Sequence, residues 1–239
     1  YQAACRLHDT ALLLKVHPSN YKISGFTEEV SIAALSDLEI PVVADLGSGF
    51  IDEGCHWLRD GKPSWLRDEP AVKQTLEAGA ALVTFSGDKL FGGPQAGVIA
   101  GRADLIEACA QHPLMRAFRP GALVLGALQQ TALAYLRRDG DSIPFWRMAQ
   151  TPVPQLLARA EAISADRSVT TSAMTGGGSL PGEEIPSAGI QLDGDVAAGL
   201  REAPIPVIAR VRDQATFIDL RTVHPDDDTS VANAIASVI

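Results

Sequence analysis

The sequence has few cysteines and no long apolar run, and both shortages exclude classes of protein. Its three cysteines, Cys5, Cys55 and Cys109, are widely spaced and form no metal-ligand pattern. This excludes a disulfide framework and a cysteine-based zinc site, and it suits reduced thiols in a cytoplasm. No apolar stretch approaches the roughly 20 residues that cross a bilayer. We therefore expect a cytoplasmic globular protein with no membrane partner.

Positive charge is also scarce in this chain. There are 20 Lys and Arg residues against 29 Asp and Glu residues, which gives a formal net charge of −9. That balance argues against a surface devoted to non-specific nucleic-acid binding, so any RNA contact must be local or supplied elsewhere. The 239 residues, of which 46% are hydrophobic, are enough for one large domain or a domain with a smaller appendage.

The first part of the chain alternates apolar strands with helices. We expect strands over 10–16, 40–45 and 80–85, and helices over 27–38 and about 68–79. Thr27 is a plausible N-cap for the first helix, and Asp68-Glu69-Pro70 has the pattern of a helix start. Residues 50–67 are expected to form an irregular loop over the sheet edge. The alternation predicts an α/β domain with a mainly parallel sheet.

The second part of the chain has a different sequence pattern, in which glycine and proline separate short strands. Helices are expected first over 103–111, 121–138 and 151–165. Strands then follow near 169–174, 188–192, 207–212 and 216–220, with helices near 196–202 and from about 226. We therefore predict a large domain over 1–150 and a small α+β domain over 151–239.

Polar residues follow each of the three expected parallel strands. They are His17, Ser19 and Asn20 after the first strand, Asp45 at the end of the second, and Ser86, Asp88 and Lys89 after the third. The carboxyl ends of parallel strands meet at one edge of a sheet, where cofactors bind.

Lys89 and Asp45 have the chemistry of a cofactor site, and each also has an ordinary interpretation. A partly desolvated lysine amine can form a Schiff base, although most loop lysines are simply solvated. A carboxylate at the position of Asp45 can cap the next helix, or it can hold a protonated pyridine nitrogen. From the residues alone, both interpretations stay open for each side chain.

The spacing of these residues resembles that of the fold-type-I enzymes that use pyridoxal 5'-phosphate (PLP). Lys89 follows Asp45 by 44 residues, and Ser86 precedes the lysine by three. The resemblance implies that Lys89 carries PLP as a Schiff base and that Asp45 holds the ring nitrogen. It also implies that Ser86 contacts the phosphate and that Asn20 lies near the phenolic oxygen of the ring.

His17, Gly92 and Gly93 belong to the same implied cofactor site. The glycine-rich turn after Lys89 would bring backbone N–H groups close to a cofactor phosphate, either its own or that of a neighbouring subunit. Two adjacent glycines alone are a weak signal.

Longer sequence runs are more specific than this spacing, and they resemble the bacterial selenocysteine synthases, the L-seryl-tRNA(Sec) selenium transferases. The likeness covers nearly all 239 residues, and the runs that carry it are 15–21, 45–49, 86–97, 112–119, 178–181, 206–210 and 220–223. The resemblance implies a PLP-dependent homo-oligomer that converts seryl-tRNA(Sec) to selenocysteyl-tRNA(Sec) with selenophosphate as the selenium donor. Asp88, beside the lysine, would assist proton transfer or help to expel the serine hydroxyl.

Arginines supply the implied substrate contacts. Arg116 and Arg119 occupy positions that in the family bind the anionic selenium donor, a task suited to guanidinium groups. Without the resemblance they describe a solvated helix end. Arg210 is an active-site candidate, because a small-domain arginine binds the substrate carboxylate in many type-I enzymes. Here that carboxylate would be esterified to RNA, so Arg210 and Arg221 are more readily taken as structural.

The family also has an N-terminal tRNA-recognition domain and a segment that provides much of the PLP phosphate site, and neither matches a part of this chain. We therefore expect an N-terminally truncated polypeptide, with weak or no PLP binding and no tRNA discrimination of its own. Two alternatives remain: a PLP-dependent lyase that acts on a small amino acid, and a cofactor-free oligomerisation module.

Overall fold

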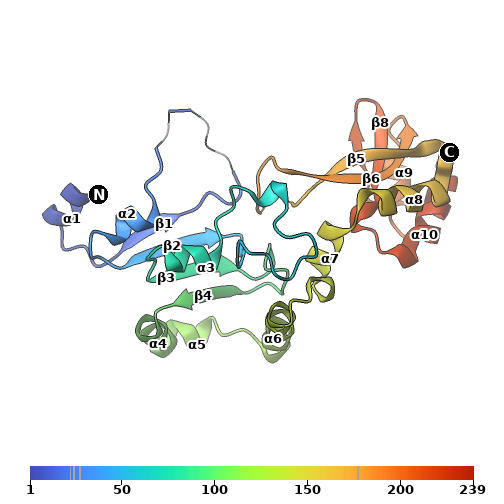
Figure 1. Cartoon of the computed structure of the whole chain (residues 1–239). Helices are drawn as coiled ribbons and strands as arrows, with labels where there is room; N and C mark the ends of the chain where they lie inside the picture. Colours follow the sequence, from blue (N-terminus) through green and yellow to red (C-terminus); the bar gives the residue numbers. More distant parts are fainter. Residues whose placement is uncertain (22, 24, 27, 177) are drawn as a thin grey trace. The chain divides into compact units, whose positions relative to one another are not determined.

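The computed structural model describes residues 1–21, 23, 25–26, 28–176 and 178–239, and it divides into two compact units (Figure 1). Unit 1 contains Tyr1–Trp146 and Gly176–Gly182, and unit 2 contains Arg147–Thr175 and Glu183–Ile239. The predicted N-cap Thr27 lies outside the described residues. Within those residues, every helix is too short or too polar to cross a membrane.

Unit 1 is built on a four-stranded sheet in the order β1-β2-β3-β4. The strands are β1 (Leu13–Val16), β2 (Val42–Gly47), β3 (Leu82–Ser86) and β4 (Gly97–Gly101). The first three are parallel, and β4 runs antiparallel to β3. This confirms the predicted α/β class with a mainly parallel sheet, and it brings the ends of β1, β2 and β3 to one edge.

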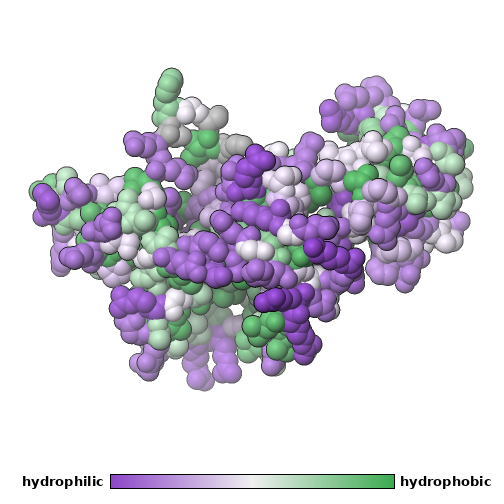
Figure 2. Space-filling model, in the orientation of Figure 1, coloured by the Kyte–Doolittle hydropathy of each residue, from purple (hydrophilic) through white to green (hydrophobic). Residues whose placement is uncertain are grey.

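The helices of unit 1 flank this sheet and continue after it. They are α1 (Gln2–Leu7), α2 (Ile32–Ser36), η1 (Ser64–Leu66), α3 (Val72–Glu77), α4 (Ala103–Gln111), α5 (Pro113–Ala117), α6 (Ala122–Leu136) and η2 (Gly140–Ser142), followed by α7 (Pro144–Gln150) at the division between the units. The prediction for α4 was correct at both ends. Hydrophobic side chains remain at the surface over α6 (Figure 2), where Leu123 is 91% exposed.

The first two predicted helices are shorter in the structure. Ser31, not an earlier residue, caps α2: its side-chain oxygen accepts a hydrogen bond from the Ala34 N–H at 3.2 Å. Helix α3 begins only after Ala71, so the prediction that Asp68-Glu69-Pro70 starts it was wrong. The reason is tertiary, because Glu69 is buried in unit 1 and is not exposed at a helix terminus.

Residues 50–67 are irregular apart from η1, but they are not a loose loop over the sheet edge. Phe50, Trp57 and Trp65 are buried. The Trp57 ring lies edge-on to Tyr135 of α6, with centroids 4.8 Å apart, and to Trp146 of α7, at 5.5 Å. Aromatic packing of this kind contributes stability beyond area burial. The segment is therefore part of the core of unit 1.

Unit 2 is an antiparallel sheet with helices packed against it. Its strands are β5 (Ser168–Met174), β6 (Glu184–Asp193), β7 (Arg210–Arg212) and β8 (Ala215–Asp219), in the order β5-β6-β8-β7. Its helices are α8 (Val153–Ser164), η3 (Ala165–Arg167), α9 (Ala197–Arg201), η4 (Leu220–Thr222), η5 (Pro225–Asp227) and α10 (Asp228–Ala236). A domain boundary at residue 150 stays a prediction.

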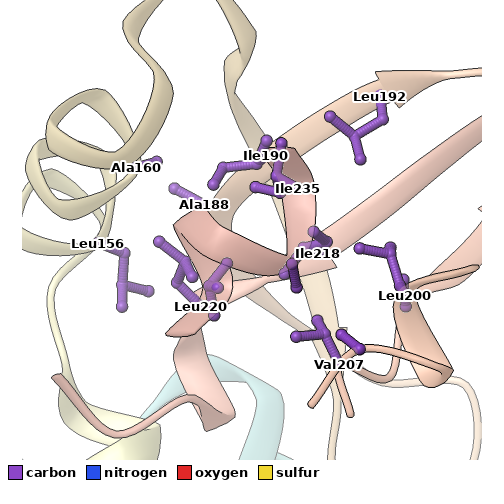
Figure 3. Packing of buried hydrophobic residues seen from close by; sticks show 14 residues of the cluster. Leu156, Ala160, Ala188, Ile190, Leu192, Leu200, Val207, Ile218, Leu220 and Ile235 are labelled. Atoms are coloured by element: carbon purple, nitrogen blue, oxygen red, sulfur yellow. The ribbon is translucent and has the colours of Figure 1, made fainter. Parts of the chain in front are cut away.

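The core of unit 2 lies between its sheet and its helices (Figure 3). Leu156 of α8, Ile190 of β6 and Ile218 of β8 are buried there, with Ile235 of α10 beside them. Burying such a side chain contributes about 1.5–3 kcal/mol. These contacts explain why the alternating apolar positions of β6 and β8 face the helices.

Candidate active site

Lys89 lies in a tight turn immediately after β3, at the carboxyl edge of the parallel strands. The Lys89 carbonyl accepts a hydrogen bond from the Gly92 N–H at 2.9 Å, and the Leu90 N–H donates to the Ser48 carbonyl at 2.8 Å. The side chain is half-buried, and its Nζ donates to Ser19 Oγ at 3.4 Å. No carboxylate of the described residues forms an ion pair with Lys89. Backbone hydrogen bonds thus fix the position of Lys89, and its amine remains available to a ligand.

Glycines leave the space that this lysine occupies. A Cβ on Gly47, whose φ is +69°, would lie 2.7 Å from Ser19 Oγ and 3.7 Å from Lys89 Nζ. A Cβ on Gly178 would lie 3.1 Å from Lys89 Cε. Both positions belong to unit 1. Larger side chains at either place would compete with the lysine for room.

Asp45 is anchored on the strand beside Lys89. It lies opposite Thr84 in the register of β2 and β3, and its Oδ1 accepts a hydrogen bond from Thr84 Oγ1 at 2.8 Å. Its backbone carbonyl accepts from the His17 N–H at 2.8 Å. In the described part of the chain Oδ2 has no hydrogen-bond donor. A half-buried carboxylate with one free oxygen is suited to hold a cationic N–H group.

The other strand-end residues predicted for the site differ in their exposure to solvent. His17 and Ser86 are half-buried, whereas Asn20 and Asp88 are exposed. In the described part of the chain, Ser19, which had no assigned role, accepts a hydrogen bond from the lysine amine at Oγ. The roles predicted for the other four stay predictions.

Gly92 and Gly93 shape the turn through their backbone. The Gly92 N–H donates to the Lys89 carbonyl, and the Gly93 N–H donates to the Gly87 carbonyl at 2.7 Å. Gly92 has a φ of +72°, and a Cβ there would lie 2.5 Å from Ile143 Cγ2. A left-handed backbone in such close packing requires glycine. Their predicted contact with a phosphate remains a prediction.

The two predicted anion-binding arginines are close in sequence and both exposed. Arg116 lies in the last turn of α5, and Arg119 follows the end of that helix. Among the described residues neither has an ion-pair partner, and neither contacts Lys89. Two unpaired guanidinium groups near each other can receive an anion.

The small-domain arginines are engaged within unit 2. Arg210 Nη2 donates to the Ser172 carbonyl at 2.6 Å and forms an ion pair with Asp219 Oδ2 at 3.2 Å. Arg221 is buried, and its guanidinium donates to backbone carbonyls, among them that of Met148 at 2.7 Å. These contacts give Arg221 a structural role and occupy Arg210.

Sequence reasoning missed Thr84 and Glu69, and it gave no role to Gly178. Thr84 could have been found, because strand alternation places it beside Asp45. The other two depend on tertiary packing. Glu69 Oε2 lies 3.7 Å from His17 Nε2, and this contact joins segments that are distant in the sequence.

Comparison with solved structures shows a protein with a similar fold. The structure of a D-glucosaminate-6-phosphate ammonia-lyase superposes with a TM-score of 0.58 at 23% identity, covering 96% of this chain and 57% of that one. At this identity the likeness concerns the fold alone. What the two proteins share is the α/β fold with a mainly parallel sheet in unit 1.

Sequence comparison then identifies the family. The family profile described as "SelA: L-seryl-tRNA selenium transferase" matches residues 1–224. The L-seryl-tRNA(Sec) selenium transferase of Moorella thermoacetica is 41% identical over 254 aligned positions, covering 97% of this chain and 53% of that protein. That of Klebsiella pneumoniae subsp. pneumoniae is 37% identical over 269 positions, with coverages of 94% and 57%. The chain belongs to this family, and it spans about half the length of the curated relatives it matches.

Proposed function

We propose that this chain is the catalytic-lysine part of a PLP-dependent enzyme that converts seryl-tRNA(Sec) to selenocysteyl-tRNA(Sec), with selenophosphate as selenium donor. The observation that carries the proposal is the placement of Lys89. Its amine is half-buried at the carboxyl edge of the parallel sheet, in the described residues its polar contact is a serine hydroxyl, and the surrounding sequence is that of the family.

The described residues fit PLP at this edge. Lys89 provides an amine that no carboxylate neutralises, and Asp45 provides a carboxylate with one free oxygen. The glycines around the lysine leave the space that a ring would need, since a Cβ on Gly47 would reach both Ser19 and Lys89. Lys89 and Asp45 would hold the cofactor, with Ser86, Asn20, His17, Gly92 and Gly93 as further proposed contacts. When bound, PLP supplies an electron sink for bonds at the serine α-carbon.

The chain's own residues would then bind the substrates and move protons. Lys89 Nζ accepts and returns a proton near the substrate α-carbon, and Ser19 Oγ steadies that amine between transfers. Asp88 is exposed beside the lysine and would assist proton transfer or help to expel the serine hydroxyl. Asp45 would hold a cationic N–H group through Oδ2, which has no hydrogen-bond donor among the described residues.

Arg116 and Arg119 would bind the selenium donor. Both guanidinium groups are exposed, and a phosphate-like anion can accept hydrogen bonds from both. The contact of Arg210 with Asp219 works against the lyase alternative, in which Arg210 would have to release that carboxylate to bind a substrate. No observation favours the cofactor-free alternative.

The protein is proposed to act in the cytoplasm as a homo-oligomer whose other parts recognise tRNA(Sec). All three cysteines are free thiols, as a reducing compartment would allow. With a net charge of −9, this half is unsuited to carry most of the tRNA contact.

The test uses the full-length protein. It is incubated with PLP and reduced with borohydride, and the expected result is a pyridoxyl group on the Lys89 peptide by mass spectrometry. Lys89→Ala should lose the label, and Lys73→Ala, a change at an exposed lysine on α3, should keep it. Conversion of seryl-tRNA(Sec) with selenophosphate is measured next. Absence of label on Lys89 in the full-length protein would refute the proposal.

A further inference from the structure

Glu69 is a buried carboxylate that has no part in the proposed reaction. It lies in the segment between η1 and α3, and 4% of its side chain is exposed. Its Oε2 is 3.7 Å from His17 Nε2, whereas Oε1 is buried and has no hydrogen-bond partner among the described residues. Burying a carboxylate with so few donors costs free energy, and an apolar side chain would fill the space at lower cost. Packing alone therefore does not explain a glutamate at this position.

A short chain of contacts leads from Glu69 to the lysine amine. The His17 N–H donates to the Asp45 carbonyl at 2.8 Å, and the His17 carbonyl accepts from the Ser19 N–H at 2.8 Å. Ser19 Oγ in turn accepts from Lys89 Nζ at 3.4 Å. The backbone of His17 thus joins Asp45 to the turn that meets the lysine, and its ring lies against the buried carboxylate of Glu69.

The ring of His17 is restrained from one side only. Its side chain is 23% exposed, and Nε2 faces Glu69. Within the described residues Nδ1 has no partner. The hydrogen bond made by one ring nitrogen sets which nitrogen carries the proton and how the ring is oriented.

We propose that Glu69 is a positioning residue of the Lys89 site. Its buried carboxylate, 3.7 Å from Nε2, favours one orientation of the His17 ring, so that His17 and the turn through Ser19 hold one arrangement beside the lysine amine. Nδ1 is then the ring atom left to meet a ligand. The inference rests on the proposed function only in its assignment of Lys89 as the reactive amine.

The test is a double-mutant cycle in the full-length protein, with Glu69→Gln, His17→Gln and the double variant. Glu77→Gln, a change at an exposed glutamate on α3, is the matched control. Two rates are measured at Lys89 by peptide mass: pyridoxyl incorporation with PLP and borohydride, and acetylation by acetic anhydride. The thermal unfolding midpoint is measured for every variant.

We expect Glu69→Gln to change both rates about 10-fold, because a neutral amide no longer attracts the His17 ring as the carboxylate does. Because Glu69 acts through His17, the double variant should match His17→Gln alone. The control should behave as wild type. If Glu69→Gln prevents folding, Glu69→Asp, which keeps the charge and shortens the reach, replaces it in the same cycle and should also change both rates.

Two results would overturn the inference: unchanged rates at Lys89 with only a lower unfolding midpoint, or additive effects of the two changes. A wild-type protein that takes up no pyridoxyl label would contradict the proposed function instead. The acetylation rates would still decide the role of Glu69 in that case, because acetic anhydride needs no cofactor.

Discussion

Arg221 is a buried cation of unit 2 whose guanidinium donates four hydrogen bonds to backbone carbonyls. It is 6% exposed, and its Nη1 donates to the carbonyls of Met148, Ala149 and Thr151 at 2.7, 3.1 and 2.9 Å. Its Nη2 donates to the Pro186 carbonyl. Burial lowers the pKa of the Arg221 guanidinium. Its N–H groups donate to carbonyls at the end of α7 and in β6. A single side chain thus ties three segments of unit 2 together.

Arg221→Lys should lower the free energy of unfolding of unit 2 by about 2–4 kcal/mol, because an ammonium cannot reach these carbonyls at once. Urea unfolding at neutral pH measures the change. Arg201→Lys, at an exposed position of α9, should remain within about 0.5 kcal/mol of wild type. Equal losses in the two variants would show that the buried contacts contribute nothing specific.

Gly47 offers a second test at the residue scale. Its backbone is left-handed and it is closely packed, whereas Gly61 has only the left-handed backbone. Gly47 has a φ of +69° and lies against Ser19, whereas Gly61 has a φ of +72° and nothing within 4 Å of the place where a Cβ would lie. Gly61→Ala should therefore cost only backbone strain, about 1 kcal/mol. Gly47→Ala should cost more and should also reduce pyridoxyl labelling of Lys89, because the methyl group displaces Ser19 Oγ. Equal stability and equal labelling of the two variants would refute a steric role for Gly47.

At the scale of elements, Asp52 ties the segment after β2 to helix α3. Its Oδ1 accepts from the Gly54 N–H and from Gln74 Nε2, both at 2.9 Å, and its Oδ2 accepts from Lys73 Nζ at 3.0 Å. Burial pushes the pKa of Asp52 up, but the hydrogen bonds from Gly54, Gln74 and Lys73 outweigh it and lower the pKa to about 2. The ionised form is therefore the one that stabilises the fold.

The lowered pKa predicts a pH-dependent loss of stability. The unfolded chain binds the Asp52 proton more readily than the folded one, so the contribution is complete above the ordinary pKa of 3.8 and is lost as the pH falls toward about 2. At neutral pH, Asp52→Asn should cost up to about 2 kcal/mol. Urea unfolding from pH 6 to pH 3 should show the difference from wild type shrinking below about pH 4. A difference that is constant across this range would contradict the assignment.

Tyr135 links α6 to α7 and to the turn after Lys89. Trp146 Nε1 donates to the Tyr135 hydroxyl at 2.6 Å, and that hydroxyl donates to the Phe91 carbonyl at 3.0 Å. Burial raises the pKa of Tyr135, so the hydroxyl remains a donor. The long helix and the lysine turn are thereby held in one packed unit.

Removal of this hydroxyl should loosen both elements. Tyr135→Phe is expected to lower the free energy of unfolding by about 1–2 kcal/mol, because a buried carbonyl loses its donor. Tyr21→Phe, at an exposed tyrosine, should have no measurable effect. Hydrogen exchange of the Leu90 and Phe91 amides should also accelerate in the first variant only. An unchanged exchange rate would show that the turn does not depend on α6.

The elements were predictable where local pattern and burial agree. The apolar runs of β2 and β3 and the helix over Ala103–Gln111 have one interpretation each, and the structure confirms them. Prediction failed where a side chain is buried by distant residues. Glu69 has the sequence pattern of a helix start, but it is buried facing His17. Trp57 has the flanking glycine and proline of a loop, but α6 and α7 cover it. Asp45 and Lys89 could be proposed from spacing, whereas the contact with Ser19 depends on the turn after β1.

For the whole molecule, the chain spans about half the length of its relatives, and this bears on how complete the site is. At the edge strand β1, Leu14 and Val16 are 59% and 58% exposed next to the proposed site. Leu123 on α6 is also largely exposed. Apolar side chains left in water at a sheet edge leave that edge less rigid than one packed on both faces.

A protein of the relatives' length that contains this chain should take up PLP on Lys89 more readily than the 239-residue chain expressed alone, by about 10-fold at equal cofactor concentration, if the additional half supplies about 1.4 kcal/mol of cofactor contacts. Borohydride trapping and peptide mass measure the fraction labelled in each protein. Circular dichroism verifies that the shorter chain is folded, and Lys89→Ala in both backgrounds gives the background signal. If the folded 239-residue chain is labelled as fully as the long protein, its own residues are sufficient for cofactor binding, and the additional half of the relatives serves substrate recognition alone.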